Sequence, residues 1–433
     1  MGDTIPKVNV HPAVFVMNTY YSGLGIARSL YGRGVDVYGL SFDSSSPGTH
    51  SRFFRAIYDV PNGRDQPEAL CRRLLEIRQY HREAPVIFAT RDFDVLFLHE
   101  YRDRLIPHYR VPENSAVPIL MDKMELARLA NAHGIRTPPT VVCSSTRELE
   151  AQIPRLPFPV VVKPRFAYQW RVKGAWQVVG ARKAFLVDDA DQLRREYQQL
   201  SPVSPEILIQ EYISGEDSDI VVCAVYMNGG YDLVSYFTAK KLRQSPPLFG
   251  TGCAVEATDV PAIVPITRSL LQVCRYTGLA EVEFKHHASS QTFYLIEVNP
   301  RHWDQHELGT LTGVNLSWVA YQEMIGWSPT RQVPIYKAGT QYKWIAEPEL
   351  LWLLLRSAYI RLRATADTSL RSRLASGLRA VRTGLAEAGY ILKGQKVLAT
   401  FHRRDPIPGV LLCLRVLREL CLKALGRAVG IRE

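Results

Sequence analysis

Short apolar runs alternate with helical patterns over the first hundred residues. Three of these runs are expected to be strands, at 13–17 (AVFVM), 35–40 and 86–89 (VIFA). A helical pattern over about 24–31 follows the first run. Strands that alternate with helices predict a parallel sheet with helices on its faces, and such sheets bind ligands beyond the carboxyl ends of their strands. Residues 18–22 and 90–92 occupy those ends.

The middle of the chain has a different pattern. Residues 121–134 read as a helix that stops at Gly134, with Pro138 and Pro139 just beyond it. Apolar or alternating runs then predict strands at 160–163, 207–213, 220–226, 280–285 and 293–298. The polar connection 286–292 has the length and polarity of a hairpin loop.

Alternation in the last two predicted strands gathers polar groups on one face. Glu281, Glu283 and Lys285 share a face of the first strand, and Glu297 and Asn299 share a face of the second. If the strands pair, Glu283, Glu297 and Asn299 can converge. Their oxygen atoms are ligands of the kind that Mg²⁺ prefers. A solvated polar face is the plainer explanation for each carboxylate alone, whereas the combined pattern favours a functional site.

Two basic residues lie where an anion would meet these strands. Arg301 follows Glu297-Val298-Asn299-Pro300 and would offer a planar fork to a phosphate or carboxylate. Lys163 closes the apolar run Val160-Val161-Val162. A lysine at the end of a buried strand usually meets an anion, so we expect Lys163 to face a ligand.

The sequence E-V-E-F, a polar spacer and then E-V-N-P-R resembles the metal-binding signature of the ATP-grasp superfamily. The resemblance covers roughly residues 10–330. It implies an ATP-dependent carboxylate–amine ligase whose magnesium ligands are Glu283, Glu297 and Asn299, with ATP and Mg²⁺ as cofactors and Mn²⁺ as a substitute.

Other motifs follow in the order of that family. The resemblance implies that Lys123 and Lys163 hold phosphates, and that the segment 210–215 (QEYISG) is the hinge that grips adenine. The nucleotide-binding residues it implies are Lys123, Lys163, Gln210, Glu211, Tyr212, Ile213 and Asp217. Glu216 rivals Asp217 as the acid on the ribose hydroxyls. Lys123 could instead be an exposed lysine at a helix start.

The segment 240–252 (KKLRQSPPLFGTG) resembles a loop of the amino-acid ligase-like branch, which includes D-aspartate ligase-like proteins. In that branch the carboxylate is activated as an acyl phosphate, which an amine then attacks. The resemblance gives Arg301 and Arg243 the catalytic role of stabilising the transferring phosphoryl group. Arg243 as a plain surface charge is the alternative.

One segment departs from the family pattern. Residues 165–174 (RFAYQWRVKG) stand where the family usually has a glycine-rich phosphate loop, and they contain one glycine. Arg171 and Lys173 could still close over phosphates, or the aromatic residues could fit a bulky acceptor. A non-catalytic nucleotide-binding regulatory or scaffold protein therefore stays an alternative.

The fold class expected is α/β and α+β, in three parts. We expect a parallel-sheet pre-ATP-grasp domain at 1–118, a two-lobed ATP-grasp domain at 119–330 with its small lobe at about 137–212, and a basic helical region at 331–433. A carboxylase or a small-molecule kinase would keep this fold. No biotin-carrier motif is present, which weighs against the carboxylase.

The net charge of +11 is confined to the C-terminal region. Residues 331–433 hold 19 Lys+Arg and 7 Asp+Glu, which leaves the rest of the chain near neutrality. A nucleic-acid partner for the body is therefore not expected. The basic region is expected to pack as amphipathic helices on the body or on a second subunit, as in a homodimer, or to dock on an anionic membrane surface.

Several other site classes are disfavoured. Gly23-x-Gly25 lacks the third glycine of a dinucleotide fingerprint, and no GxxxxGK[ST] phosphate loop exists. The seven cysteines form no CxxC pair, and His286, His287, His302 and His306 have no zinc-site spacing. No signal-peptide pattern or long apolar run is evident, so we expect a cytoplasmic protein. The expected partners are a small-molecule carboxylate and an amine, whose identities the sequence does not give.

Overall fold

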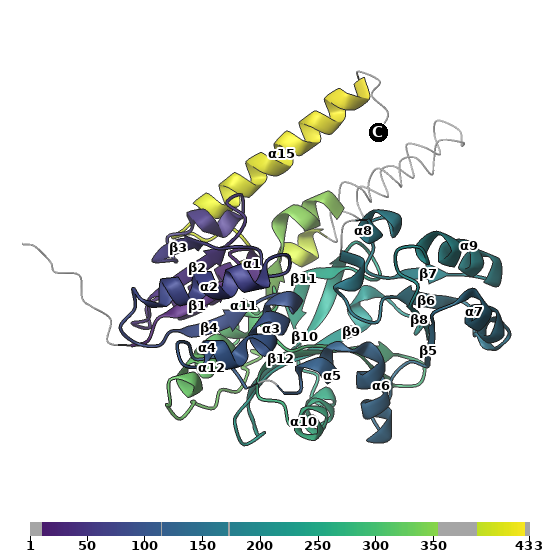
Figure 1. The fold of residues 1–433 in the computed structure, drawn as a ribbon, viewed down its shortest axis with the longest axis horizontal. Helices are drawn as coiled ribbons and strands as arrows, with labels where there is room; N and C mark the ends of the chain where they lie inside the picture. The colour runs from purple at the N-terminus through teal and green to yellow at the C-terminus, as the bar shows by residue number, and fades with distance from the viewer. Residues whose placement is uncertain (1–10, 114, 172–173, 354–387, 429–433) are drawn as a thin grey trace, which may run out of the picture.

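The computed structural model describes residues 11–113, 115–171, 174–353 and 388–428 of the 433. Three β-sheets organise this part of the chain: one of seven strands and two of four. Helices pack around them, and one long C-terminal helix extends away from the body (Figure 1). The predicted combination of a parallel α/β unit with a larger mixed unit is confirmed, while the predicted domain boundaries stay a prediction.

The first sheet is parallel, in the order β3-β2-β1-β4. Its strands are β1 (Val14–Met17), β2 (Val37–Ser41), β3 (Ala56–Asp59) and β4 (Val86–Ala89). Helices α1 (Tyr21–Leu30), α2 (Pro67–Arg78), α3 (Asp92–Glu100) and α4 (Arg102–Leu105), with the 3₁₀ turn η1 (Pro47–His50), complete the unit. The carboxyl ends of β1 and β4 carry residues 18–22 and 90–92, as the sequence predicts.

The glycines after β1 serve close packing. Helix α1 begins at Tyr21, three residues earlier than the pattern predicts. A Cβ atom on Gly23 would lie 2.1 Å from the Asn18 carbonyl oxygen, and one on Gly25 would lie 2.7 Å from the His306 ring. The pair of glycines is therefore explained by a tight strand-to-helix connection and an inter-helix contact.

The second sheet is a small antiparallel unit, in the order β5-β8-β6-β7. Its strands are β5 (Thr140–Cys143), β6 (Val160–Lys163), β7 (Phe185–Val187) and β8 (Ile207–Glu211). It carries α7 (Thr146–Gln152), η2 (Ile153–Arg155), η3 (Gln169–Arg171), α8 (Ala175–Val178) and α9 (Ala190–Leu200). Strand β8 ends at Glu211, two residues before the predicted end, so Tyr212 and Ile213 belong to the connection that follows.

The helix that leads to the small sheet is shorter than predicted. The predicted range 121–134 contains α6 (Lys123–Ala132), and a separate helix, α5 (Val117–Met121), ends where that range begins. Asp122 separates them because its carboxylate accepts hydrogen bonds from the Met124 and Glu125 amides and so caps α6. Gly134, with φ of +72°, ends the helix as predicted.

The third sheet has the order β13-β12-β9-β10-β11-β14-β15. Its strands are β9 (Ile220–Met227), β10 (Leu233–Ser245), β11 (Thr251–Ala257), β12 (Gly278–His287), β13 (Thr292–Asn299), β14 (Tyr342–Ile345) and β15 (Gln395–Leu398). The attached helices are η4 (Asp217–Asp219), α10 (Ile263–Val273), α11 (Glu307–Leu311) and α12 (Leu316–Met324). Side chains of β9 alternate between an apolar layer under α10 and another against α1 and α12.

The C-terminal region contains two β-strands in addition to the helices expected from the sequence. Strands β14 and β15 extend the large sheet, and they pair with each other in parallel. Helix α15 (Ile407–Ala428) begins after Asp405-Pro406. The apolar run 350–355 is helical as far as residue 353, and its last two residues lie outside the described part. Among the described residues, no helix is long and apolar enough to cross a membrane.

Candidate active site

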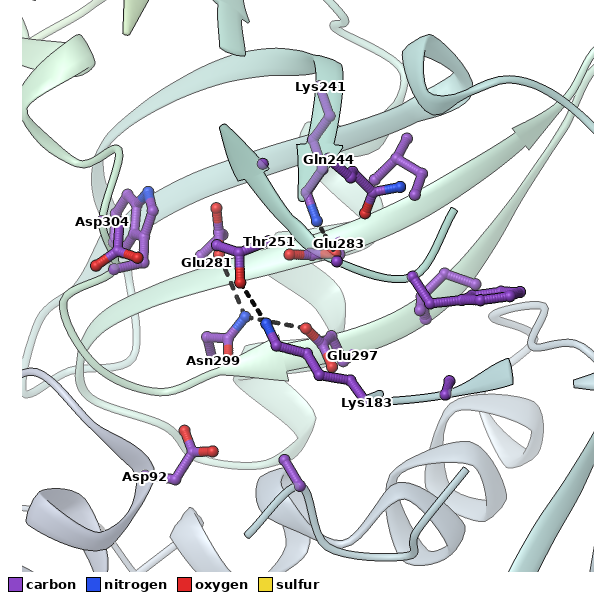
Figure 2. A pocket seen from close by; sticks show the side chains of 18 of the residues that line it. Asp92, Lys183, Lys241, Gln244, Thr251, Glu281, Glu283, Glu297, Asn299 and Asp304 are labelled. Carbon is purple, nitrogen blue, oxygen red and sulfur yellow. Dashed lines mark hydrogen bonds and ion pairs between the residues drawn. The ribbon is translucent and has the colours of Figure 1, made fainter. Parts of the chain in front are cut away.

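A cavity of about 510 Å³ opens where the three sheets meet. Side chains from the ends of β1 and β4, from β6 and β8 of the small sheet, and from β10, β12 and β13 of the large sheet line it. Figure 2 shows its centre, where acidic side chains of the large sheet face a lysine that reaches in from beside β7. The cavity therefore combines residues that lie up to 287 positions apart in the sequence, from Asn18 to Gln305.

The acidic centre arises from the pairing of β12 with β13. Glu281 pairs with Asn299, and Glu283 pairs with Glu297, so their side chains share the face that lines the cavity. Asn299 Nδ2 lies 3.2 Å from Glu281 Oε2 and 3.4 Å from Glu297 Oε1. The predicted convergence of Glu283, Glu297 and Asn299 is confirmed as geometry, and the structure adds Glu281 as a third carboxylate.

Burial and the repulsion between neighbouring carboxylates both affect the pKa values of these three glutamates. Burial and the neighbouring Glu283 raise the pKa of Glu281 to about 8. Burial also raises the pKa of Glu283, although Lys241 opposes this shift. At Glu297 the raising effect of burial is outweighed by four surrounding lysines, so its pKa is lowered. Glu297 is thus the carboxylate of this group that is held most firmly in its charged form.

Four lysines from different elements surround this centre: Lys123, Lys163, Lys183 and Lys241. Lys241 Nζ donates to Glu283 Oε2 at 2.7 Å, and both side chains are buried. Lys183 Nζ donates to Thr251 Oγ1, and burial and Arg171 lower its pKa to about 8. Burial also lowers the pKa of Lys123. Ammonium groups gathered in such a buried site favour an anionic ligand.

Lys163 joins this centre to the hinge of the small sheet. Its side chain is 6% exposed, and its Nζ donates to Gln210 Oε1 at 2.8 Å. Burial and the repulsion of Lys123 lower the pKa of Lys163 to about 7. Gln210 in turn donates to Thr140, which fixes the amide toward the lysine. The predicted hinge residues Gln210, Glu211, Tyr212 and Ile213 all line the cavity.

Asp217 also lines the cavity, on the 3₁₀ turn η4 after the hinge. Its carboxylate accepts hydrogen bonds from the Gln244 backbone amide and from Gln244 Nε2, both at 2.9 Å. The rival Glu216 lines the cavity as well, and its carbonyl oxygen accepts a hydrogen bond from Lys285. Both acids are therefore held by the surrounding turn, and the choice of Asp217 for the ribose hydroxyls stays a prediction.

Arg301 is fixed at the junction of the first and third sheets. Its Nε donates to Asp92 Oδ1 at 2.7 Å, and one terminal nitrogen donates to Asn299 Oδ1 at 3.0 Å. Burial lowers the pKa of Arg301, but Asp92 outweighs this effect and the pKa is raised. Arg171 lies 3.9 Å from the same carboxylate. The predicted placement of Arg301 inside the site is confirmed.

Arg243 is not among the residues that line the cavity, and its predicted catalytic role stays a prediction. The pairing of β10 with β11 shifts register on both sides of Arg243. Such a bulge changes which side chains face each side of a strand. As a result Lys241 and Gln244, three positions apart, line the cavity, and Lys241 is the cation that this part of β10 brings into it.

The segment after Lys163 is built around a buried tryptophan. Trp170 is fully buried, stacks on Phe185 and donates to Ser204 Oγ at 3.1 Å. Arg165 forms an ion pair with Asp122 at 2.7 Å and so connects the segment to the start of α6. Arg171 lines the cavity as predicted, whereas Lys173 lies outside the described residues.

The oxygen atoms at the centre fit a hard cation. Glu281, Glu283, Glu297 and Asn299 provide carboxylate and amide oxygens of the type that Mg²⁺ prefers. No three His, Cys, Asp or Glu side chains of the described residues are gathered closely enough to hold a metal ion as they lie. Binding of an ion would therefore require Glu283 to leave Lys241 and Glu297 to leave Asn299, so that both carboxylates can contact the ion instead.

The sequence missed several residues that the structure brings into the cavity: Asp92, Lys183, Lys241, Gln244, Glu281 and Asp304. The sequence contains a pattern that could have indicated two of these residues. Glu281 shares the alternating face of Glu283, and Asp92 belongs to the segment 90–92 that follows the strand end at Ala89. The positions of Lys183 and Asp304 depend on contacts between distant segments, and no local pattern indicates them.

Comparison with known proteins agrees with this geometry. No protein-family model matches the chain. The chain is 22% identical over 320 residues to a D-aspartate ligase of Enterococcus faecium, an alignment that covers 70% of this chain and 73% of the relative. It is 26% identical over 205 residues to a D-alanine–D-alanine ligase of Delftia acidovorans, covering 44% of this chain and 58% of the relative.

Solved structures match over more of the chain. An ADP complex of an N5-carboxyaminoimidazole ribonucleotide synthetase superposes with a TM-score of 0.61 at 11% identity, and covers 89% of this chain and 100% of its own. An L-amino acid ligase from Bacillus licheniformis superposes with a TM-score of 0.54 at 14% identity over 73% of this chain and 74% of its own. The chain has the fold of these enzymes, and the predicted resemblance to ATP-grasp ligases is confirmed.

The buried ion pair between Asp92 and Arg301 gives a stability prediction. The substitution Asp92→Asn leaves the Arg301 guanidinium buried without its carboxylate, so we expect the free energy of unfolding in urea to fall by about 3–5 kcal/mol. Burial raises the pKa of Asp92, but Arg301 and Arg171 lower it to about 2, below the ordinary value of 3.8. The part of the wild-type advantage over Asp92→Asn that is linked to this shift, about 2–3 kcal/mol, should therefore be complete above the ordinary pKa and should be lost as the pH falls through about 2.

The matched control is Glu76→Gln, which breaks the exposed pair between Glu76 and Arg73 at 3.0 Å. This change should alter the unfolding free energy by less than about 0.5 kcal/mol. Equal losses for the two variants would contradict a special role for the Asp92–Arg301 pair.

Proposed function

We propose that this chain, which has the ATP-grasp fold, is an ATP- and magnesium-dependent ligase that joins a carboxylate to an amine. The observation that carries the proposal is the cavity centre, in which three carboxylates of the large sheet face four lysines from separate elements. The relatives named D-aspartate ligase and D-alanine–D-alanine ligase support this class of reaction. The ADP complex among the structural matches supports the nucleotide.

The residues divide into two groups along the cavity. Lys123 and Lys163 would bind phosphate oxygens, while Gln210 to Ile213 would surround the base and Asp217 would accept from the ribose hydroxyls. Glu281, Glu283, Glu297 and Asn299 would hold Mg²⁺, with Mn²⁺ as an alternative ion because it accepts the same oxygen ligands. When bound, the ion supplies positive charge that reduces repulsion between phosphate and an incoming carboxylate.

The reaction proceeds in two displacements. A carboxylate oxygen of the substrate attacks the γ-phosphorus of ATP, the bond from that phosphorus to the β–γ bridging oxygen breaks, and ADP leaves. The amine nitrogen then attacks the carbonyl carbon of the acyl phosphate, inorganic phosphate leaves, and the nitrogen gives up its proton to solvent or phosphate. Arg301, held by Asp92 and Asn299, is placed to stabilise the transferring phosphoryl group.

The alternative functions differ from the ligase either in the acceptor substrate or in having no turnover. A carboxylase or a small-molecule kinase would use the same phosphate and metal residues, so the acceptor alone separates them from the ligase. A non-catalytic nucleotide-binding protein would have no need for a cluster of buried, mutually repelling carboxylates. Such clusters cost stability and are typical of catalytic sites.

The direct test is a screen for ADP release with Mg²⁺, ATP and pairs of carboxylates and amines. We expect ADP release that requires both a carboxylate and an amine. The variant Glu297→Gln should lower turnover by about 100-fold or more, because it removes the most firmly charged carboxylate of the centre.

The fold of Glu297→Gln should be retained, as judged by circular dichroism and thermal unfolding. A matched control is Glu196→Gln, whose carboxylate pairs with Arg182 at 3.3 Å away from the cavity lining and should leave turnover unchanged. Wild-type turnover by Glu297→Gln would refute its role. Phosphorylated product with no amide would identify a kinase instead.

A second prediction concerns protonation of Lys163. Its lowered pKa of about 7 means that a large fraction of the side chain is neutral at neutral pH in the absence of ligand. A bound triphosphate favours the charged form, so ATP binding should take up protons and the ATP affinity should rise as the pH falls through the pKa. Calorimetry in two buffers of different ionisation enthalpy measures this uptake.

The variant Lys163→Ala should bind ATP about tenfold more weakly or worse, and should lose the proton uptake. Lys163→Arg keeps a permanent charge and should bind ATP without the uptake. If Lys163→Ala binds ATP with unchanged affinity, Lys163 does not contact the nucleotide.

We also propose that helix α15 attaches the protein peripherally to an anionic membrane. Its solvent side presents the apolar side chains Ile407, Val410, Leu411 and Leu414, which are 38–57% exposed, beside the exposed Arg415 and Arg418. The helix extends away from the three sheets (Figure 1). Exposed apolar groups flanked by basic ones, in a region with net charge +12, favour an anionic lipid surface.

Sedimentation with phosphatidylglycerol vesicles tests this attachment. We expect binding at low salt, weaker binding at high salt, and little binding to phosphatidylcholine vesicles. The double variant Leu411→Ser with Leu414→Ser should lose binding, whereas Tyr80→Ser, which removes an apolar side chain that is 78% exposed elsewhere, should retain it. A concentration-dependent dimer that the double variant abolishes would assign this face to a second copy of the chain.

A further inference from the structure

The lysines and the Asp304 carboxylate lie in different parts of the cavity. Lys123, Lys163, Lys183 and Lys241 surround the end next to the small sheet and β10. At the other end the wall comes from the carboxyl ends of β1 and β2 and from the segment after β13. In Figure 2 Asp304 lies on one side of Glu281 and Asn299, and Gln244 lies on the other.

The end beside Asp304 is lined by hydroxyl, aromatic and acidic side chains. Its lining includes Tyr20, Ser22, Phe42, Asp43, Trp303 and Asp304. The tyrosine, phenylalanine and tryptophan rings give this end apolar walls, and the two aspartates give it negative charge. Aromatic faces and carboxylates are both favourable surroundings for a cation.

The nearby arginine does not reverse this charge. Arg91 lines the cavity, but its guanidinium is engaged with the buried Asp94, with distances of 2.6 Å to Oδ1 and 3.0 Å to Oδ2. The same guanidinium lies over the Phe42 ring, 4.7 Å from its centre. Because this pair is electrically neutral, Arg91 does not cancel the charge of Asp43 and Asp304. Arg301, which also lines the cavity and interacts electrostatically with Asp304, is itself paired with Asp92.

The Asp304 carboxylate is oriented by a hydrogen bond from Ser22. Ser22, near the start of α1, donates from Oγ to Asp304 Oδ1 at 2.6 Å. Within the described part of the chain, Oδ2 of Asp304 accepts no hydrogen bond, and the carboxylate forms no ion pair. The side chain is half-buried and lines the cavity, so one oxygen is fixed while the other is available to a ligand.

We propose that Asp304 binds the acceptor amine of the ligase as its ammonium ion and so selects a cationic acceptor; before the chemical step the ammonium ion gives up one proton to water, and the neutral nitrogen then attacks the acyl phosphate. This inference rests on the proposed function. The lysines hold the triphosphate and the carboxylate substrate at one end, while Asp304 holds the opposite charge at the other. The charge gradient therefore orients the two substrates with the amine facing the activated carboxylate.

The specificity follows from desolvation. A neutral or anionic group at this end would leave Asp304 partly buried without a counter-charge, whereas an ammonium ion replaces its lost hydration with a charged hydrogen bond. Ser22 is a positioning residue, because it contacts Asp304 and orients the carboxylate. The acceptor class that fits this end is a primary amine that carries positive charge at neutral pH.

The first test measures binding directly, with n-butylammonium chloride as the probe and 1-butanol as its uncharged counterpart. Ligand-observed NMR on the full-length protein with ATP and Mg²⁺ should show butylammonium bound to the wild type and about tenfold more weakly bound to Asp304→Asn. Butanol should bind both proteins equally. Asp188→Asn, which removes an exposed carboxylate outside the cavity lining, should behave as the wild type.

The second test uses turnover. Hydroxylamine, which is largely uncharged at neutral pH, traps an acyl phosphate as a hydroxamate without an ammonium contact. Asp304→Asn should form hydroxamate at the wild-type rate and should raise the KM for an amine acceptor about tenfold or more, with the KM for ATP unchanged. Asp304→Glu keeps the charge and should recover part of the amine affinity.

The outcomes separate the two proposals. An absence of hydroxamate and ADP release for the wild type with every carboxylate would overturn the ligase function itself. Hydroxamate formation together with an unchanged amine KM, or equal butylammonium binding, in Asp304→Asn would overturn the role of Asp304 and leave the ligase function standing.

Discussion

The compensation of buried charge is the constraint on which this structure depends. Glu281, Glu283 and Glu297 lie together in one cavity, and their mutual repulsion is tolerated because lysines from other elements surround them. The direct contact at 2.7 Å between Lys241 and Glu283 is the clearest case. Removing carboxylates from water costs several kcal/mol per group, so each must find a partner when the chain folds.

The same constraint explains why three sheets meet at one point. The carboxylates come from the β12–β13 hairpin, Lys163 comes from the small sheet, and the Arg301–Asp92 pair joins the large sheet to the parallel one. Each unit thus supplies a charge that another unit compensates. A cavity with this arrangement is ready for a polyanion and a metal ion, because both would replace contacts that the protein already makes to itself.

The C-terminal region contributes to the fold as well as to the surface. Strands β14 and β15 extend the large sheet beyond β11, and Glu349 accepts hydrogen bonds from Tyr21 at the start of α1. The Tyr20 ring packs on Tyr21 and lines the cavity. Composition alone describes this region as a basic tail. Its Glu349 is nevertheless connected, through Tyr21, to Tyr20 at the end of the cavity that holds Asp304.

The sequence by itself determined the features that depend on local periodicity. Alternation placed Glu283, Glu297 and Asn299 on one face, an apolar run placed Lys163 at a strand end, and strand-to-helix patterns gave the parallel sheet. Tertiary structure alone decided the rest. A register shift in β10 places Lys241, and not Arg243, in the lining of the cavity. Contacts between distant segments bring Lys183 and Asp304 to the cavity and β15 to the edge of the sheet. The physical reason is that strand period and helix period are properties of neighbouring residues, whereas bulges, register and burial are set by the partner against which a segment packs.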